Sequence, residues 1–219
     1  MAIIFFSGVG AVGKTSVIDE FKNDDNFRVM PSITRSVYAK LGIESEEAAL
    51  NSSIDTKLLL QQIIFFTYID TVRKLAKSSV SENLIIDRSP IDHWSYFMSK
   101  YKPTILNDEN YVKKYRKLVY LKEVATLAFF EELKFNYEDI LVVKFPFPNP
   151  WNTKDTTSSD GFRSDAYSSN LNWEKDLADS LSNCRSKLSF NLDVLVLKSG
   201  LATPTDRYKE ILGYLERNL

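Results

Sequence analysis

The sequence has one cysteine, one histidine and almost no net charge, and each scarcity argues against a class of protein. Cys184 alone cannot form an intramolecular disulfide, which fits a reducing compartment. His93 has no second histidine and no cysteine cluster with which to bind zinc, and no Ser–His–Asp motif includes it. The formal net charge of −1 gives no overall positive field that would attract nucleic acid or an anionic membrane.

Long apolar runs are missing as well. The apolar run at the N-terminus is short and has no basic segment before it, unlike a signal peptide. The longest later stretch, residues 58–69, contains Gln61 and Gln62 and is shorter than the roughly 20 residues that a membrane-spanning helix needs. We therefore expect no membrane partner and a cytoplasmic location.

What the sequence does contain is an alternation of short apolar runs with longer helical segments. Continuous apolar runs are typical of strands that are covered on both faces of a parallel sheet. The expected strands are Ala2–Ser7, Phe27–Met30, Asn83–Asp87, 139–145 and 191–198. The expected helices are residues 14–22, 36–41, 55–77, 91–101, 110–133, 171–187 and 205–218. This alternation predicts an α/β fold, a three-layer αβα sandwich with a parallel five-stranded sheet.

The same alternation runs along the whole chain, with no obvious linker, and predicts a single domain over residues 1–219. One stretch breaks it. Residues 146–170 are rich in Pro, Ser, Thr, Asp and Asn and show little periodicity. Because a loop of this length in a compact domain is usually functional or mobile, we interpret it as a mobile lid.

A phosphate-binding motif follows the first expected strand. Residues 8–15 read Gly-Val-Gly-Ala-Val-Gly-Lys-Thr and match the P-loop pattern G-x-x-x-x-G-K-[ST], with a strand before and a helix after. Glycines let the backbone N–H groups face phosphates, and the helix N-terminus favours the same anion. Lys14 can then reach the β- and γ-phosphates of ATP, and the Thr15 hydroxyl can bind Mg²⁺. The expected nucleotide-binding residues are Gly8, Gly10, Val12, Gly13, Lys14, Thr15 and Ser16.

A second polar group ends the strand Asn83–Asp87. A carboxylate at this position in a P-loop fold holds Mg²⁺, so Asp87 is a predicted metal-binding and catalytic residue. Arg88 emerges at the carboxyl end of the sheet, where it can contact a phosphate or the acceptor. For Asp92 two interpretations stay open: it caps the following helix, or it lines the acceptor site.

These motifs resemble those of nucleoside and nucleotide kinases. Asp-Arg followed by a helix resembles thymidylate kinases, and Asp87-Arg88-Ser89 resembles the Glu-Arg-Ser motif of deoxynucleoside kinases. The spacing from Asp87-Arg88 to Asp92 and Tyr96 is similar to the group that contains nicotinamide riboside kinase domains and phage nucleotide kinases. The resemblance runs in order from Gly8 to the C-terminal helix, and it implies that the Asp serves the metal or activates the acceptor hydroxyl.

Three further residues are assigned by this resemblance. Thr34-Arg35-Ser36 resembles an acceptor-side element, which implies that Arg35 binds the acceptor. Asp160-Gly161-Phe162-Arg163 resembles a lid motif whose arginine closes over the transferring phosphoryl group, a catalytic role for Arg163. In similar kinases the loop after the last strand borders the adenine, where Arg207 would lie along the base.

The acceptor site has one candidate from helical periodicity. Gln62 falls on the same stripe as Leu58, Phe65 and Ile69, where an apolar residue is expected. A buried amide needs hydrogen-bonding partners, and two explanations remain. Gln62 either reads the edge of an acceptor base or bonds to backbone, unless the helix is rotated and Gln61 points outward.

Together these features predict a P-loop kinase that transfers the γ-phosphate of ATP to a nucleoside or nucleoside monophosphate, with Mg²⁺. A GTPase is disfavoured because residues 87–90 read Asp-Arg-Ser-Pro and not Asp-x-x-Gly, and because no Asn-Lys-x-Asp motif occurs. A kinase acting on a hydroxymethylated base or an end within DNA or RNA is less favoured, and a nucleotide-binding switch is the alternative of another class. The basic helical segment that a polynucleotide would need is better explained as a solvated face: Lys113, Lys114, Arg116, Lys117 and Lys122. A homodimer stays open.

Overall fold

Three short strands form a buried centre because each is a continuous apolar run. In the computed structural model, β1 (Ala2–Ser7), β3 (Asn83–Asp87) and β4 (Asp139–Lys144) lie side by side, and most of their residues are buried on both faces. The edge strands β2 (Phe27–Met30) and β5 (Asp193–Val196) are only partly buried. All pairs are parallel, in the order β2-β3-β1-β4-β5, which confirms the predicted five-stranded parallel sheet.

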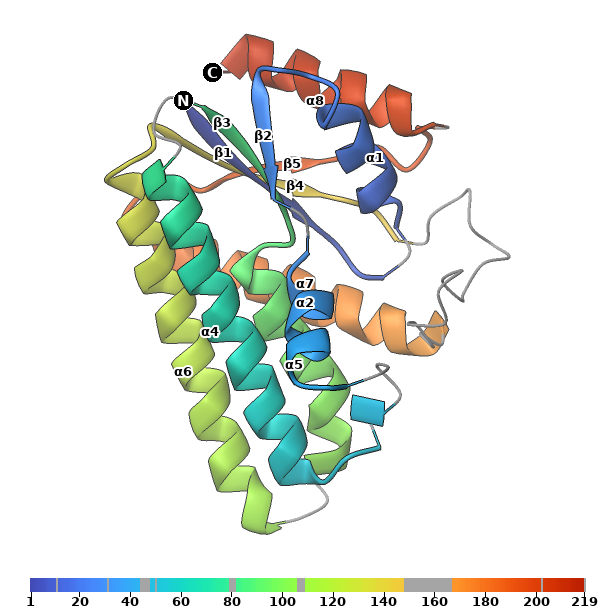
Figure 1. Cartoon of the computed structure of the whole chain (residues 1–219), viewed down its shortest axis with the longest axis vertical. Helices are drawn as coiled ribbons and strands as arrows, with labels where there is room; N and C mark the ends of the chain where they lie inside the picture. The colour runs from blue at the N-terminus through green and yellow to red at the C-terminus, as the bar shows by residue number, and fades with distance from the viewer. Residues whose placement is uncertain are drawn as a thin grey trace.

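The structure describes residues 1–10, 12–30, 32–43, 48–49, 51–78, 82–105, 109–147, 167–201 and 203–218. Its helices are α1 (Lys14–Phe21), α2 (Thr34–Lys40), α4 (Ile54–Ser78), α5 (Pro90–Ile105), α6 (Glu109–Lys134), α7 (Tyr167–Lys187) and α8 (Pro204–Asn218). Figure 1 shows α1 and α8 on one side of the sheet and the helices α4 to α7 on the other. The three predicted layers are therefore present.

The two helical layers are fastened to the sheet by alternate residues of β1. Successive side chains of a strand point to opposite faces. Phe6 meets Phe21 of α1 with ring centroids 5.6 Å apart, whereas Phe5 meets Phe130 of α6 at 5.6 Å on the other face. The adjacent pair of phenylalanines thus fixes both outer layers around the strand that leads into the phosphate motif.

Most element boundaries agree with the sequence-based expectation within a few residues. α5 is longer than expected, because it begins at Pro90 and continues to Ile105. Residues 148–166 of the predicted lid lie outside the described ranges, while residues 167–170 form the first turn of α7. Across the described ranges, no helix has both the length and the apolar character needed to span a bilayer.

Strand register brings three chain segments together at one edge of the sheet. Phe6 lies opposite Asp87 of β3, and Ser7 lies opposite Lys144 of β4. The loop that follows β1 is therefore flanked by the carboxyl ends of β3 and β4. In open α/β sheets this edge is where ligands bind, so the fold places the predicted phosphate motif at the expected position.

Candidate active site

Two glycines of the phosphate loop adopt backbone conformations that other residues rarely accept. Gly8 has a φ of +150° and Gly13 a φ of +85°. A Cβ atom on Gly8 would lie 3.1 Å from a methyl of Val12 and 3.2 Å from Phe145. Gly13 also stands at the N-cap of α1, where no side chain caps the helix. The N-terminal amides of α1 thus stay available to an anion.

Lys14 lies across this loop. Its side chain is 7% exposed, and Nζ donates hydrogen bonds to the carbonyl oxygens of Gly8 at 2.6 Å and Val9 at 2.8 Å. The ammonium is therefore held at the loop itself. The next two residues, Thr15 and Ser16, are exposed on the first turn of α1.

Asp92 joins the phosphate loop to α5. The sequence Ser89-Pro90-Ile91-Asp92 forms a capping box, in which the Ser89 hydroxyl accepts from the Asp92 N–H at 3.3 Å. One carboxylate oxygen of Asp92 accepts from the Ser89 N–H at 2.8 Å and hydroxyl at 2.6 Å. The other accepts from the Gly8 N–H at 2.8 Å. Asp92 is fully buried, so its geometry matches the capping interpretation, and binding of an acceptor by this residue stays a prediction.

Asp87 has the opposite character. It is 8% exposed at the end of β3, and its Oδ1 atom is buried with no hydrogen-bond partner in the described part of the chain. The Ser7 hydroxyl, at the end of the neighbouring strand, is unpartnered in the same sense. Buried oxygens without partners are costly unless a ligand satisfies them. A metal ion held by the Thr15 hydroxyl, and through water by Asp87, would give the unpartnered oxygen of Asp87 a ligand role.

Described residues contain no group of three or more His, Cys, Asp or Glu side chains arranged to hold a metal ion. This finding does not contradict the predicted Mg²⁺ site, because that site needs only one carboxylate, one hydroxyl and oxygens from phosphate and water.

Arg88 has a strained backbone, and its guanidinium has no hydrogen bond or ion pair to another described residue. Its φ is +77°, a left-handed conformation that is uncommon for a residue other than glycine. The Arg88 N–H donates to the Phe6 carbonyl at 2.9 Å, and its own carbonyl accepts from the Tyr68 hydroxyl at 2.7 Å. Burial, with the charges of Asp92 and Asp87, raises the pKa of Tyr68 well above its usual value, so the phenol stays protonated and donates.

A partly buried ion pair that sequence reasoning missed lies beside the loop. Lys144, the last residue of β4, pairs with Glu174 of α7 at 2.7 Å, with side chains 16% and 20% exposed. Burial raises the pKa of Glu174, an effect that Lys144 partly offsets, and the charges of Asp92 and Lys14 also act on this carboxyl. The two residues are far apart in the sequence, so only the packing of α7 on the sheet edge reveals the pair.

Arg207 supports the phosphate loop from inside the protein. Its side chain is fully buried, one guanidinium nitrogen donates to the Val12 carbonyl at 2.5 Å, and the group lies 5.5 Å from the ring of Phe145. These contacts do not test the expectation that Arg207 lies along an adenine base. In this structure Arg207 stabilises the loop through the Val12 carbonyl, and a contact with a nucleotide stays a prediction.

The acceptor-side residues differ from the periodicity argument by one position. Gln61, not Gln62, shares the buried face of α4 with Leu58 and Phe65. Gln62 is half-buried, and its amide nitrogen donates to the Leu58 carbonyl at 3.2 Å, which is the backbone alternative. Reading of an acceptor base by Gln62 stays a prediction.

His93 of α5 and Lys122 of α6 are both buried. His93 packs its ring 4.6 Å from that of Tyr68, and burial together with the charges of Arg88 and Lys122 lowers its pKa well below the usual value. Lys122 was expected on a solvated basic face with Lys113 and Lys114, but it is 1% exposed. The basic segment of α6 is therefore split between surface and interior.

Two predicted arginines cannot be placed. Arg35 is the second residue of α2, and its side chain lies outside the described part. Arg163 lies within residues 148–166, also outside it. Both assignments therefore stay predictions.

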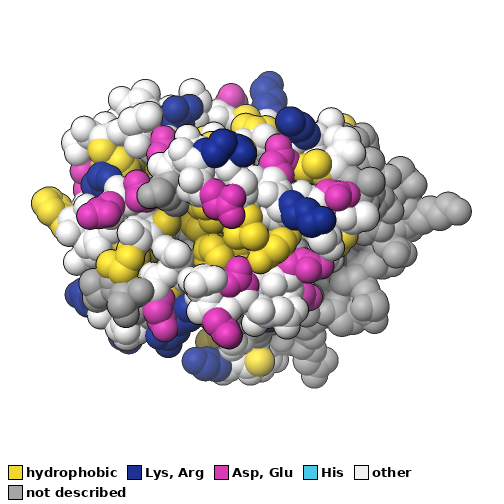
Figure 2. Space-filling model, turned by 90° about the horizontal axis from the view of Figure 1, so that it is seen from above, with side chains coloured by type: hydrophobic (Ala, Val, Ile, Leu, Met, Phe, Trp, Pro, Cys, Tyr) yellow, Lys and Arg dark blue, Asp and Glu magenta, His cyan; other side chains and the backbone are white. Residues whose placement is uncertain are grey.

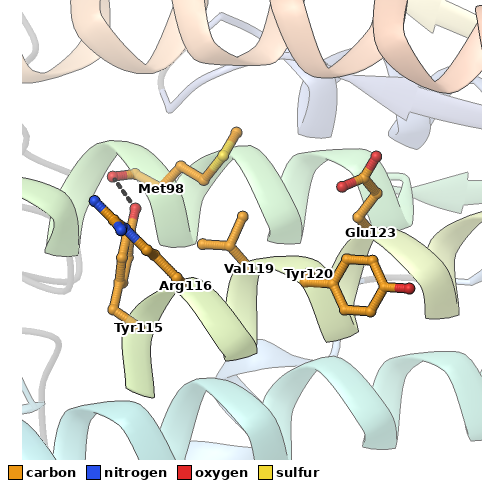
Figure 3. Close-up of a pocket in the computed structure, with 6 residues that line it drawn as sticks. All are labelled: Met98, Tyr115, Arg116, Val119, Tyr120 and Glu123. Atoms are coloured by element: carbon orange, nitrogen blue, oxygen red, sulfur yellow. Dashed lines mark hydrogen bonds between the residues drawn. The ribbon is translucent and has the colours of Figure 1, made fainter. Parts of the chain in front are cut away.

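A separate cavity of about 260 Å³ lies between α5 and α6. Figure 3 shows its lining, in which the Tyr115 hydroxyl donates to the Met98 carbonyl at 3.3 Å. Its other lining residues are Arg116, Val119, Tyr120 and Glu123. None of them belongs to the phosphate-loop edge, so this cavity is not part of the candidate active site.

The fold of the chain is similar to that of two kinases of known structure. The deoxyadenosine kinase of M. mycoides with bound dATP matches over 99% of both chains, with a TM-score of 0.62 and 15% identity. The thymidylate kinase of Candida albicans matches over 99% of this chain and 91% of its own, with a TM-score of 0.61 and 11% identity. The chain has the fold of these kinases.

A second structure of the M. mycoides deoxyadenosine kinase, with bound dCTP, gives a TM-score of 0.53 at 14% identity and covers 99% of this chain and all of its own. No protein-family model and no curated protein sequence matches the chain. The likeness is thus one of structure, at a sequence identity of 15% or less.

Proposed function

We propose that this protein is an ATP- and Mg²⁺-dependent kinase that phosphorylates a nucleoside or a nucleoside monophosphate. Two observations at one edge of the sheet carry the proposal: Lys14 is held across a glycine-rich loop, and the Oδ1 atom of Asp87, at the end of the neighbouring strand, is buried and unpartnered in the described structure. The fold shared with a deoxyadenosine kinase and a thymidylate kinase supports an acceptor from the deoxynucleoside and deoxynucleotide class.

Lys14 has the first role. Its ammonium exchanges the carbonyl oxygens of Gly8 and Val9 for the β- and γ-phosphate oxygens of ATP, while the backbone N–H groups at the start of α1 bind the same phosphates. Because the lysine already lies at the loop, little side-chain ordering remains to be done on binding.

Asp87 and Thr15 would hold the magnesium ion. When bound, Mg²⁺ offsets the negative charge of the phosphates and helps to orient them. Asp87 is also our candidate for accepting the proton of a nucleoside hydroxyl, because both oxygens of Asp92 already accept hydrogen bonds from the loop and the cap.

Arg88 supplies a guanidinium at the same edge for the phosphoryl group or for an acceptor phosphate. Arg35 and Arg163 are proposed to add further positive charge, Arg35 at the acceptor and Arg163 from the lid, within one kinase domain over residues 1–219. The interspersed Lys, Arg, Asp and Glu side chains on the face in Figure 2 offer no continuous basic track there for a polynucleotide.

The test is a transfer assay with ATP labelled on the γ-phosphate. A panel of deoxynucleosides, their monophosphates, nicotinamide riboside and DNA oligomers is incubated with the enzyme and Mg²⁺, and the labelled product is identified. We expect label on a nucleoside or a monophosphate. The control is Lys14→Ala, which should fold normally and transfer nothing.

Two other results would redirect the proposal. Label on DNA oligomers alone would make the protein a polynucleotide kinase. Binding of ATP with no acceptor-dependent release of ADP, across the whole panel, would contradict a kinase and favour a nucleotide-binding switch.

A further inference from the structure

The guanidinium of Arg88 is held by an aromatic face. Its central carbon lies 5.1 Å from the ring of Trp173, a residue of α7 that is 1% exposed. The backbone of Arg88 is fixed independently, by the bonds to Phe6 and Tyr68 described above. Trp173 is therefore the contact that decides where the side chain of Arg88 points.

A cation–π contact of this kind leaves the N–H donors of the guanidinium unused. No hydrogen bond or ion pair within the described residues uses the Arg88 side chain, although arginine carries five N–H donors in its plane. The contact with the ring uses none of the N–H donors, and the planar set of donors on an arginine matches the geometry of a phosphate. Arg88 is thus oriented without being neutralised.

Trp173 is itself locked to α5. Its indole N–H donates to the Ser95 hydroxyl at 3.0 Å, and Ser95 donates to the Asp92 carbonyl at 3.1 Å. The ring of Tyr96 meets the indole edge-on at 5.0 Å. Since Asp92 bonds to the Gly8 N–H, these contacts form a continuous path from α7 to the phosphate loop.

We propose that Trp173 is a positioning residue that holds the guanidinium plane of Arg88 so that its N–H edge faces the phosphoryl group in transfer. This inference rests on the proposed kinase function. Trp173 touches no reacting atom in this account, and it acts only through Arg88. Because α7 begins directly after residues 148–166, the same contact ties the helix that follows the predicted lid to the catalytic arginine.

A double-mutant cycle tests the inference. Trp173→Leu removes the ring, and we expect a loss of about tenfold in kcat with a smaller change in the KM for ATP. Trp173→Phe keeps a ring and should lose no more than about threefold. In an Arg88→Ala background, Trp173→Leu should have no further effect on kcat, because the group that it positions is gone.

The matched control is Trp94→Leu, which truncates an equally buried indole on α5. We expect it to lower thermal stability without a loss of kcat that depends on Arg88. An equal loss of kcat from Trp173→Leu with and without Arg88 would overturn the inference, because it would indicate general packing.

A readout that needs no turnover separates this inference from the proposed function. In protein labelled with ¹⁵N-arginine, the side-chain resonance of Arg88, assigned by its loss in Arg88→Ala, should carry a ring-current shift that persists in Trp173→Phe. A resonance without this shift in the native protein would overturn the positioning role, even if Trp173→Leu fails to fold. Absence of phosphate transfer by the native protein, with the shift present, would instead overturn the proposed function.

Discussion

Two lysines are buried in different regions of the molecule, Lys14 at the phosphate-loop edge and Lys122 in the helical layer of α4, α5 and α6. The two ammonium groups have different surroundings. Lys14 bonds to two carbonyl oxygens of a loop whose neighbours, Thr15 and Ser16, are exposed. Lys122 donates to the Gln61 carbonyl at 2.9 Å and lies 4.2 Å from the ring of Phe65. No carboxylate within the described ranges pairs with Lys122.

The surroundings of the two lysines suggest different consequences of burying a charge. At the sheet edge the Asp87 Oδ1 atom and the Ser7 hydroxyl are buried without a partner among the described residues, as expected of a site that a ligand completes. Inside the helices, burial lowers the pKa of Lys122 to about 7, which is the response expected of an ammonium without an opposite charge. We therefore expect the first lysine to serve function and the second to lower stability.

The same substitution at both lysines sharpens this comparison most. Lys14→Met should reduce kcat by a factor of about a thousand or more, because the loop loses the cation that offsets charge on the γ-phosphate. Its unfolding temperature should change little. Steady-state kinetics and thermal unfolding measure the two effects, and a Lys14→Met protein that keeps activity would break the comparison.

Asp87→Asn should have the next largest effect. The change keeps the size of the side chain but removes a negative charge from the predicted metal site, so we expect kcat to fall about a hundredfold. The Mg²⁺ concentration needed for half-maximal rate should rise. Asp70→Asn, at an exposed carboxylate of α4, is the matched control and should be silent. An unchanged Mg²⁺ requirement in Asp87→Asn would remove Asp87 from the metal site.

Lys122→Met tests the other half of the comparison through pH. The pKa of Lys122 is about 7 in the folded protein and ordinarily 10.5, so the folded state binds fewer protons between these values. The destabilisation is therefore full below about pH 7 and disappears as the pH rises towards 10.5, with a size of a few kcal/mol. Lys122→Met should raise the free energy of unfolding at pH 7 and remove this pH dependence.

Urea unfolding at a series of pH values measures that effect, with Lys113→Met as an exposed control on the same helix. Activity of Lys122→Met should stay within about threefold of the native value, since Lys122 lies outside the phosphate-loop edge. A lower stability of Lys122→Met across the whole pH range would show that its cation is favourable where it lies.

The smallest effect is expected at an exposed ion pair. Arg28 lies 3.4 Å from Glu82, and both side chains are about half exposed. Solvent and salt screen such a pair, so Arg28→Gln should change the free energy of unfolding by less than about 0.5 kcal/mol. A larger change in thermal unfolding would mean that edge strand β2 depends on this contact.

The sequence predicts the central parts of the molecule well because their physics is local. Continuous apolar runs predict β1, β3 and β4, whose residues are covered on both faces, and the glycine spacing of residues 8–15 predicts the phosphate loop. The edge strand β5 is shorter than expected: it spans only Asp193–Val196 of the eight residues predicted, the four that pair with β4.

Side-chain partners that lie far apart in the chain were not predictable. Helical periodicity places the buried face of a helix only to within about one residue, and one residue turns a side chain by roughly 100°. The apolar pattern of α4 therefore does not show whether Gln61 or Gln62 is buried. The contact of Arg88 with Trp173 and the pairing of Lys144 with Glu174 depend on how α7 packs on the sheet edge. Neither motif spacing nor composition contains that information.

The central claim is that the loop between β1 and α1 grips a triphosphate through Lys14. Calorimetric titration of the native protein and of Lys14→Ala with AMP, ADP and ATP, each with Mg²⁺, tests it directly. We predict that affinity for the native protein rises with each added phosphate, and that Lys14→Ala removes most of this rise. Equal affinity of the native protein for AMP and ATP would contradict the claim.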